Sequence, residues 1–129
     1  AGLNFGDLMQ RVGNYPAPPG SPPDIPGLEM AGEVVALGPH AYRFSVGDRV
    51  MAVVCGGGQG EMLAVHERQL MPVPDALTWE QAGGFPEAFL TGYDVAAFAA
   101  NRAFRFELQR RQCGSPARRV LGIGAQAAR

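Results

Sequence analysis

Apolar residues along the chain occur in short runs bounded by glycine and proline, which predicts a series of short strands. The runs at 32–37, 48–54, 60–66 and 69–73 are each rich in aliphatic side chains, and a glycine or proline turn lies at one end or both. Strands that follow one another at this spacing are typical of a small barrel. The pattern therefore indicates a mainly β fold with short helices.

The first residues predict a short helix over 5–12. Asn4 can cap its start, and Asp7, in the first turn, is favoured there by the helix dipole. Gly13 occupies the position where glycine commonly ends a helix. The following segment, 15–23, contains five prolines, which fix φ and lack a backbone donor. We expect an extended loop there instead of a strand in a sheet.

After residue 77 the pattern becomes helical. Thr78 and Gln81 have the spacing of a capping box, so a short helix should begin there. Pro86 is suited to the first position of a second helix, which the apolar spacing extends over 87–100.

Composition places the chain among globular proteins. Its 129 residues are 47% hydrophobic and 18% charged, and its 18 glycines and 11 prolines favour turns over a helical bundle. No apolar run reaches the roughly 18 residues that span a bilayer, and no signal peptide is visible, so we expect a cytoplasmic protein without a membrane partner. Cys55 and Cys113 show no metal or disulfide spacing and are expected to be free thiols. The chain begins at Ala1 without methionine, so its natural start is expected to lie upstream.

Charge divides the chain near residue 101. Residues 1–101 carry four arginines and eleven acids, whereas residues 102–129 carry seven arginines and one acid. Such a reversal predicts a boundary, with one unit over 1–100 and an Arg-rich tail over 101–129 that is poorly ordered or foreign to the unit before it. The net charge of −1, and a tail without interleaved aromatic residues, give no basis for expecting a nucleic-acid partner.

Three motifs in order carry a resemblance to a known family. They are Gly2-Leu3-Asn4-Phe5-Gly6-Asp7, then Pro26-Gly27-Leu28-Glu29-Met30-Ala31-Gly32-Glu33-Val34, then Phe44-Ser45-Val46-Gly47-Asp48-Arg49-Val50. Each motif alone is weak, but their order and spacing over residues 1–100 resemble the medium-chain dehydrogenases/reductases. The closest branch is that of the zinc-independent, zeta-crystallin-like quinone oxidoreductases.

The resemblance implies a fold and an activity. Residues 1–100 would form the GroES-like β-barrel of the catalytic domain, incomplete where the family's first strands would precede Ala1. NADPH or NADH would lie between this barrel and a Rossmann domain, and a hydride would pass to a quinone or an α,β-unsaturated carbonyl. Full-length relatives are expected to be homodimers that pair chiefly through the Rossmann domain.

The resemblance also implies site residues. Asn4, Tyr15 and Thr91 would lie near the nicotinamide end of the cofactor, with Asn4 and Tyr15 also contacting the substrate, while Asp7 would lie beside the same cleft. Each has a structural alternative that the sequence leaves open. Asn4 can simply cap its helix, Asp7 can stabilise the helix start, Tyr15 can anchor its loop at the surface, and Thr91 can bond to the preceding helical turn. For Glu29 a structural hydrogen bond is the expected role.

Residue types argue against a zinc site. Zinc-dependent relatives place a cysteine and a histidine where this chain has Asn4-Phe5 and Leu28, and neither phenylalanine nor leucine can bind zinc. With only two cysteines, the chain also lacks the four-cysteine structural zinc lobe. We expect no metal, which disfavours a zinc alcohol dehydrogenase.

The resemblance ends after residue 98. The segment 102–111 does not match the glycine-rich loop that opens the family's Rossmann domain. Gly122 to Ala127 has the form of a dinucleotide fingerprint, but we expect a chance match, because the fingerprint needs a βαβ unit and the sequence ends two residues later. Truncation, a shifted reading frame and a genuine alternative end all remain open. The 129 residues alone are expected to be weakly active or inactive as an oxidoreductase. The alternative is a GroES-like module that binds a partner without catalysis.

Overall fold

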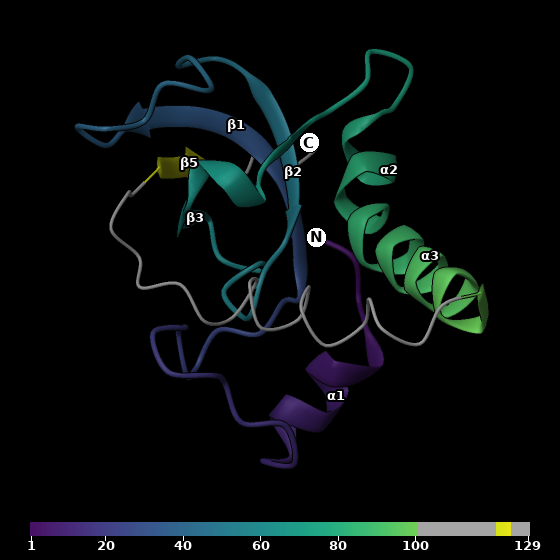
Figure 1. Ribbon diagram of the computed structural model, residues 1–129. Helices are drawn as coiled ribbons and strands as arrows, with labels where there is room; N and C mark the ends of the chain where they lie inside the picture. The colour runs from purple at the N-terminus through teal and green to yellow at the C-terminus, as the bar shows by residue number, and fades with distance from the viewer. Residues whose placement is uncertain (101–120, 125–129) are drawn as a thin grey trace.

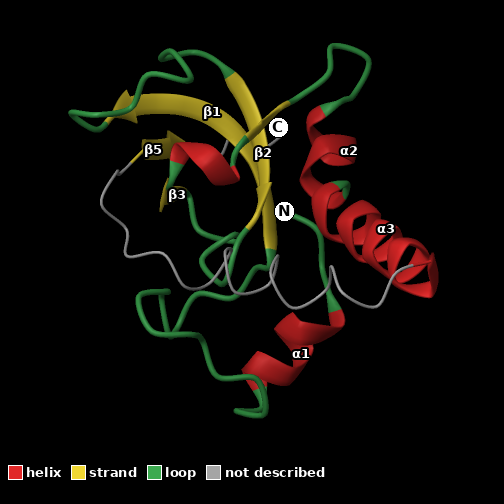
Figure 2. Ribbon diagram, viewed as in Figure 1, coloured by secondary structure: helices red, strands yellow, loops and turns green. Residues whose placement is uncertain are grey.

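The computed structural model describes residues 1–100 and 121–124, which form an open antiparallel sheet with helices beside it (Figures 1 and 2). The sheet has the strand order β3-β5-β1-β2-β4. Its strands are β1 (Glu29–Leu37), β2 (Arg49–Val53), β3 (Met62–Val65), β4 (Met71–Pro72) and β5 (Leu121–Gly124). The long β1 is the central strand, pairing with β2 on one side and β5 on the other. The expected mainly β fold is confirmed, and the open sheet agrees with an incomplete barrel.

The helices begin where the sequence predicts. The first is α1 (Phe5–Arg11), and α2 (Trp79–Gly84) and α3 (Pro86–Ala100) lie between β4 and β5 in the chain. The predicted capping box of α2 is present, since the Thr78 N–H donates to Gln81 Oε1 at 3.0 Å and the Gln81 N–H donates to Thr78 Oγ1 at 3.3 Å. Figure 1 shows α2 and α3 beside β2, with α1 near the lower end of the sheet.

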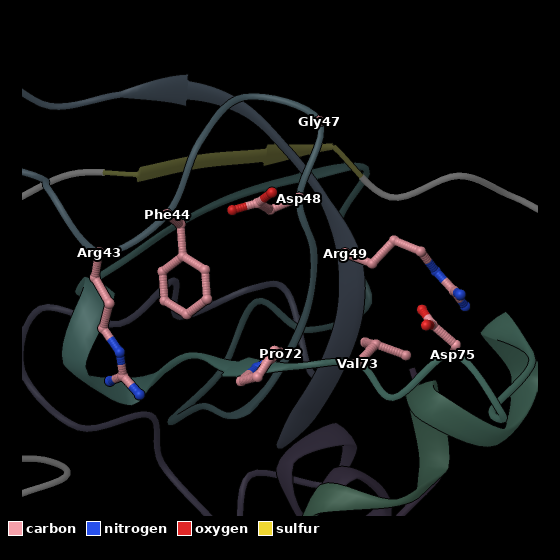
Figure 3. Close-up of a pocket in the computed structure, with 8 residues that line it drawn as sticks. All are labelled: Arg43, Phe44, Gly47, Asp48, Arg49, Pro72, Val73 and Asp75. Carbon is pink, nitrogen blue, oxygen red and sulfur yellow. The ribbon is translucent and has the colours of Figure 1, made fainter.

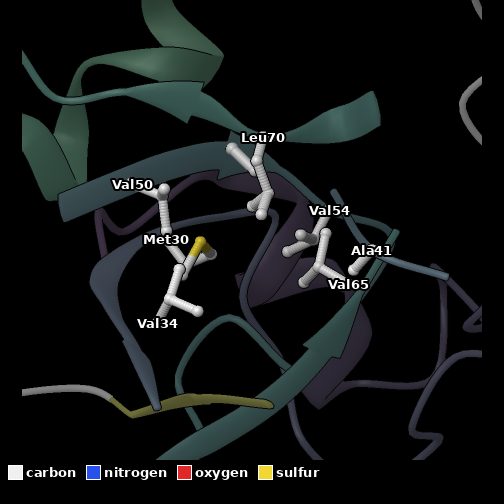
Figure 4. Packing of buried hydrophobic residues seen from close by; sticks show 8 residues of the cluster. Met30, Val34, Ala41, Val50, Val54, Val65 and Leu70 are labelled. Atoms are coloured by element: carbon white, nitrogen blue, oxygen red, sulfur yellow. The ribbon is translucent and has the colours of Figure 1, made fainter. Parts of the chain in front are cut away.

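Two hydrophobic clusters cover the two faces of β2. Successive side chains of a strand point to opposite faces, and Val50 and Ala52 accordingly enter one cluster while Met51 enters the other. The larger cluster lies inside the curve of the sheet (Figure 4) and comprises Met30, Val34, Ala41, Val50, Ala52, Val54, Val65 and Leu70. The smaller one joins Met51 and Val73 to Ala82 of α2. The helix pair is thus fixed to the outer face of the sheet.

Two elements were not predicted. A short 3-10 helix, η1 (Glu67–Gln69), separates β3 from β4, and its buried Glu67 accepts the backbone N–H groups of Tyr42 and Arg43 at 2.8 and 2.9 Å. Strand β5 lies between β1 and β3 and is antiparallel to both. It is the described part of the predicted tail; the other tail residues, 101–120 and 125–129, lie outside the described structure. Among the described helices, none combines the length and the apolar composition that crossing a membrane requires.

Candidate functional site

The first helix is fixed at both ends by the residues that the sequence singles out. At its start, Asn4 and Asp7 form a capping box in which the backbone N–H of Asn4 donates to Asp7 Oδ2 at 2.8 Å. At its end, Gly13 has φ of +76°, and the N–H groups of Gly13 and Asn14 donate to Gln10 O and Met9 O at 3.0 and 2.9 Å. This pair of bonds is a Schellman motif, which ends α1 and turns the chain into the proline-rich loop.

Asp7 also joins the first motif to the second. The residue is 3% exposed, and its Oδ1 accepts the backbone N–H of Gly27 at 2.9 Å. Both carboxylate oxygens are therefore occupied by backbone donors, one within α1 and one in the loop before β1. Asp7 thus stabilises the start of α1, which is the structural alternative that the sequence left open for it.

Gly27 in turn packs against the glycine-rich turn that follows β2. Gly27 has φ of +116°, and a Cβ atom at this position would lie 2.7 Å from Gly58 Cα. The N–H groups of Gly57, Gly58 and Gln59 donate to the carbonyls of residues 25–27 over 2.7–3.1 Å. The turn at residues 56–58 is therefore buried and hydrogen-bonded, and glycine is needed there for close approach of two backbones.

Glu29 is the centre of the site. It is 2% exposed, its Oε1 accepts the side-chain amide of Asn4 (Nδ2) at 2.9 Å, and its Oε2 accepts the backbone N–H of Glu87 at 3.0 Å. One carboxylate therefore joins the start of α1 to the start of α3, where the helix dipole also favours negative charge. The structural hydrogen bond expected for Glu29 is confirmed.

Gly2 provides the space that Glu29 occupies. A Cβ atom on Gly2 would lie 2.9 Å from Glu29 Cδ and 3.1 Å from Gly84 Cα, and the Gly2 N–H donates to Gly83 O of α2 at 2.6 Å. The first residues of the chain are thus held between α2 and the buried carboxylate. The glycine, asparagine and aspartate of the first motif each have a contact that explains their residue type.

Thr91 lies one turn further along α3 and is exposed. Its Oγ1 donates to Glu87 Oε1 at 3.0 Å, so the bond to the preceding turn is made to a side chain and not to a backbone carbonyl. Asn4, Glu29, Glu87 and Thr91 therefore form one continuous series of contacts. Sequence reasoning did not single out Glu87, although its spacing of four residues from Thr91 on a predicted helix was a usable signal.

Tyr15 lies on the α1 side of this site. It is 45% exposed, and its ring edge (Cε1) is 3.9 Å from where a Cβ atom on Gly6 would be. Leu28 Cδ1 is even closer to the same point, at 2.6 Å, so Gly6 leaves room for both side chains. The structure thus places Tyr15 beside the first turn of α1, where Asn4 begins the helix.

The site is acidic. Asp7, Glu29 and Glu87 place three carboxylates at the starts of α1, β1 and α3, and the hydrogen bonds that these carboxylates make run to backbone N–H groups, an amide and a hydroxyl. This environment suits neutral or cationic polar groups, and it repels phosphates. In the part of the chain that the structure describes, no group of three His, Cys, Asp or Glu side chains is arranged to hold a metal ion.

A separate hollow of about 520 Å³ lies on another part of the surface (Figure 3). It is open to solvent and is lined by Arg43, Phe44, Gly47, Asp48, Arg49, Pro72, Val73 and Asp75. Two arginines and two aspartates give it no net sign of charge. Arg49 is already engaged, because its guanidinium stacks 4.3 Å from the Trp79 ring and donates to Leu77 O at 3.0 Å. None of the predicted site residues lines this hollow.

Two curated proteins are similar in sequence to most of this chain. The human synaptic vesicle membrane protein VAT-1 homolog-like is 39% identical over 100 residues, which are 78% of this chain and 24% of that protein. A quinone oxidoreductase-like protein 2 homolog from Nematostella vectensis is 36% identical over 102 residues, 78% of this chain and 27% of that protein. The chain therefore spans about a quarter of the length of these curated relatives.

A solved structure and a family profile complete the comparison. The crystal structure of the human VAT-1 homolog-like protein matches with a TM-score of 0.68 and 36% identity, over 78% of this chain and 32% of that one. The profile of the alcohol dehydrogenase GroES-like domain matches residues 1–75, more than half of the chain, which include Asn4, Asp7 and Glu29 of the site. The chain therefore belongs to the alcohol dehydrogenase GroES-like domain family, within the medium-chain dehydrogenases/reductases that its motifs resemble.

Proposed function

We propose that the chain is the catalytic-domain part of an NAD(P)H-dependent oxidoreductase that transfers a hydride to a quinone or an α,β-unsaturated carbonyl without zinc. The observation that carries the proposal is the continuous contact from Asn4 through Glu29 and Glu87 to Thr91. This contact brings together Asn4 and Thr91, which are 87 positions apart in the sequence and which the family resemblance assigns to the same end of the cofactor.

The chemistry of these residues fits the nicotinamide end of a dinucleotide better than the phosphate end. An amide, a hydroxyl and a half-exposed tyrosine ring can hold and orient a flat polar ring. The oxidised nicotinamide is cationic, which the neighbouring carboxylates favour. The backbone N–H of Glu87 at the start of α3, which could bind a phosphate, is already bonded to Glu29. The bound cofactor would supply the hydride, and this chain would supply position and exclusion of water.

The residues at the zinc positions support a metal-free reaction. Leu28, which stands in place of a histidine ligand, packs onto Gly6 and thereby fills space beside α1. Phe5 is exposed and offers no ligand atom. The acceptor is therefore proposed to be a small quinone or enone, held without a Lewis acid.

Fluorescence titration with NADPH tests the proposal. The 129-residue chain is compared with an extended form that continues into a Rossmann domain, each as wild type and as Asn4→Ala and Thr91→Val. We expect saturable binding only in the extended form, weakened by both substitutions, with Asn14→Ala as the matched control. If neither form binds NADPH or NADH, the cofactor assignment is wrong.

A second function, a binding module without catalysis, is favoured by one observation. Leu3, Phe5 and Leu8 are large apolar side chains at or beside α1, and each is more than half exposed. Such side chains are common at protein interfaces. An extended form that fails to bind any nicotinamide cofactor would favour this second function over the first.

A further inference from the structure

We propose that Glu29 is the positioning residue of this site, because it fixes the orientation of the Asn4 amide and so the hydrogen-bonding groups that Asn4 offers to a ligand. The inference rests on the proposed function only in assigning that ligand to the cofactor. Glu29 touches no ligand itself in this proposal, since both of its carboxylate oxygens are bonded within the protein.

The orientation of Asn4 follows from which groups can donate. A carboxylate only accepts hydrogen bonds, so the arm of the Asn4 amide that faces Glu29 Oε1 at 2.9 Å must be its amino group. The carbonyl arm then faces the N–H of Asp7 in the first turn of α1, with capping-box geometry, although that N–H donates to the backbone carbonyl of Asn4 at 3.1 Å and not to its side chain. The bond to Glu29 therefore determines which arm is which, and the amide keeps its second N–H and its carbonyl oxygen in fixed directions for a ligand.

Because of the second oxygen of Glu29, replacing one carboxylate oxygen by an amino group, as in Glu29→Gln, would disturb the orientation of Asn4. Oε2 accepts the backbone N–H of Glu87 at 3.0 Å, and a backbone N–H cannot reverse its direction. In Glu29→Gln the new side chain must keep its oxygen toward Glu87, so its amino group faces the amino group of Asn4. Asn4 can relieve this clash only by turning its own amino group toward the N–H of Asp7. No orientation of the Asn4 amide satisfies both neighbours.

Exchanging the two side chains restores every partner. In the double variant Asn4→Asp with Glu29→Gln, one oxygen of the new aspartate can accept from the glutamine amino group and the other can face the N–H of Asp7. The net charge is that of the wild type. The single variant Asn4→Asp instead places two carboxylates against each other where Glu29 is 2% exposed. Both single variants are therefore unfavourable, and the double variant is not.

A double-mutant cycle on the chain measures this coupling. We expect each single variant to lower the thermal midpoint by about 5–10 °C, and the double variant to regain most of the combined loss. Asn14→Asp and Glu33→Gln are matched controls for the same chemical changes at other positions, and their effects should simply add. If the losses of Asn4→Asp and Glu29→Gln also add, Glu29 does not orient Asn4 and the proposal is overturned.

NMR provides a readout that is independent of folding stability. In the wild type, the side-chain amide hydrogens of Asn4 should exchange slowly with solvent and show an NOE to Glu29, whereas those of Asn14 should not. This spectrum decides the matter even if Glu29→Gln does not fold, since a rapidly exchanging Asn4 amide without that NOE would overturn the inference.

NADPH titration of the extended form separates this inference from the proposed function. Affinity that falls in the single variants and recovers in the double variant supports both. If the wild type binds no cofactor while the thermal cycle still shows recovery, the proposed function is wrong and the positioning of Asn4 by Glu29 stands.

Discussion

Asp7 provides the sharpest test of how the two motifs are held together. Its buried carboxylate accepts the N–H of Asn4 at 2.8 Å and the N–H of Gly27 at 2.9 Å, and no solvent can replace it at Gly27, where the bond is buried. Hydrogen bonds to a charged group contribute about 1.5–3 kcal/mol each, and an orphaned buried donor costs about 1–3 kcal/mol. Asp7→Ala should therefore lower the free energy of unfolding by about 3–5 kcal/mol.

The isosteric change Asp7→Asn should cost less, about 2 kcal/mol, because its amide oxygen still accepts one N–H while its amino group faces the other donor. Asp48 is the matched control. Its Oδ2 accepts the N–H of Ser45 at 2.7 Å over the same three-residue spacing, but at an exposed position where water can take its place. We expect Asp48→Ala to cost less than about 1 kcal/mol.

Urea unfolding followed by circular dichroism measures these differences. The ranking Asp7→Ala, then Asp7→Asn, then Asp48→Ala is the expected result, with similar m-values throughout. Equal losses for Asp7→Ala and Asp48→Ala would refute the reasoning, because they would show that the buried link to Gly27 contributes nothing beyond an exposed turn.

Three further predictions concern other parts of the chain. Gly27→Ala should lower the free energy of unfolding by more than about 3 kcal/mol, because its Cβ would clash with the neighbouring backbone and the position also has a positive φ. Gly13→Ala, whose added Cβ meets nothing within 4 Å, should lower it by only about 1–2 kcal/mol. Equal losses in urea unfolding would contradict this. Arg49→Lys should lower the free energy of unfolding by about 1 kcal/mol, because lysine cannot stack its side chain on the Trp79 ring as the planar guanidinium does at 4.3 Å. The fluorescence emission of Trp79, the only tryptophan, should also shift. Unchanged fluorescence would count against the stacking. The pKa of Glu80 is held below its ordinary value chiefly by the hydrogen bond from its own backbone N–H. The ionised Glu80 side chain therefore stabilises the fold above the pKa of the unfolded chain, and this stabilisation disappears as pH falls through the lower folded value. We expect Glu80→Gln to make the thermal midpoint fall less steeply at acid pH. An unchanged slope would contradict this.

Most of the strands and helices could be predicted because residues close in sequence determine where they begin and end. Thr78 and Gln81 identify the start of α2, and Gly13 identifies the end of α1, from side-chain chemistry within a few residues. Strand β5 could not be predicted this way, since two of its four residues are glycines, which have low strand propensity, and it forms a strand through pairing with β1 and β3. Non-local pairing also fixes the turn at residues 56–58, whose backbone partners lie some 30 positions earlier.

The site was predictable only in part. The assignment of Asn4, Asp7, Tyr15 and Thr91 to the cofactor stays a prediction, whereas Glu29 was expected to make a structural hydrogen bond, which it does. Which atom donates and which accepts in each of these hydrogen bonds could not be predicted from the sequence, because it depends on how α1, β1 and α3 come together. Glu87 was missed for the same reason: its backbone contributes to the site as much as its side chain does.

The position of β5 has a consequence for synthesis of the chain. Because β5 lies between β1 and β3, both strands emerge from the ribosome long before the strand that pairs with them. At roughly 5–20 residues per second, the intervening stretch takes on the order of seconds to translate, and during that time two unpaired strand edges are available to other nascent chains. A chaperone that covers exposed strands would therefore be most useful to this protein just before β5 is synthesised.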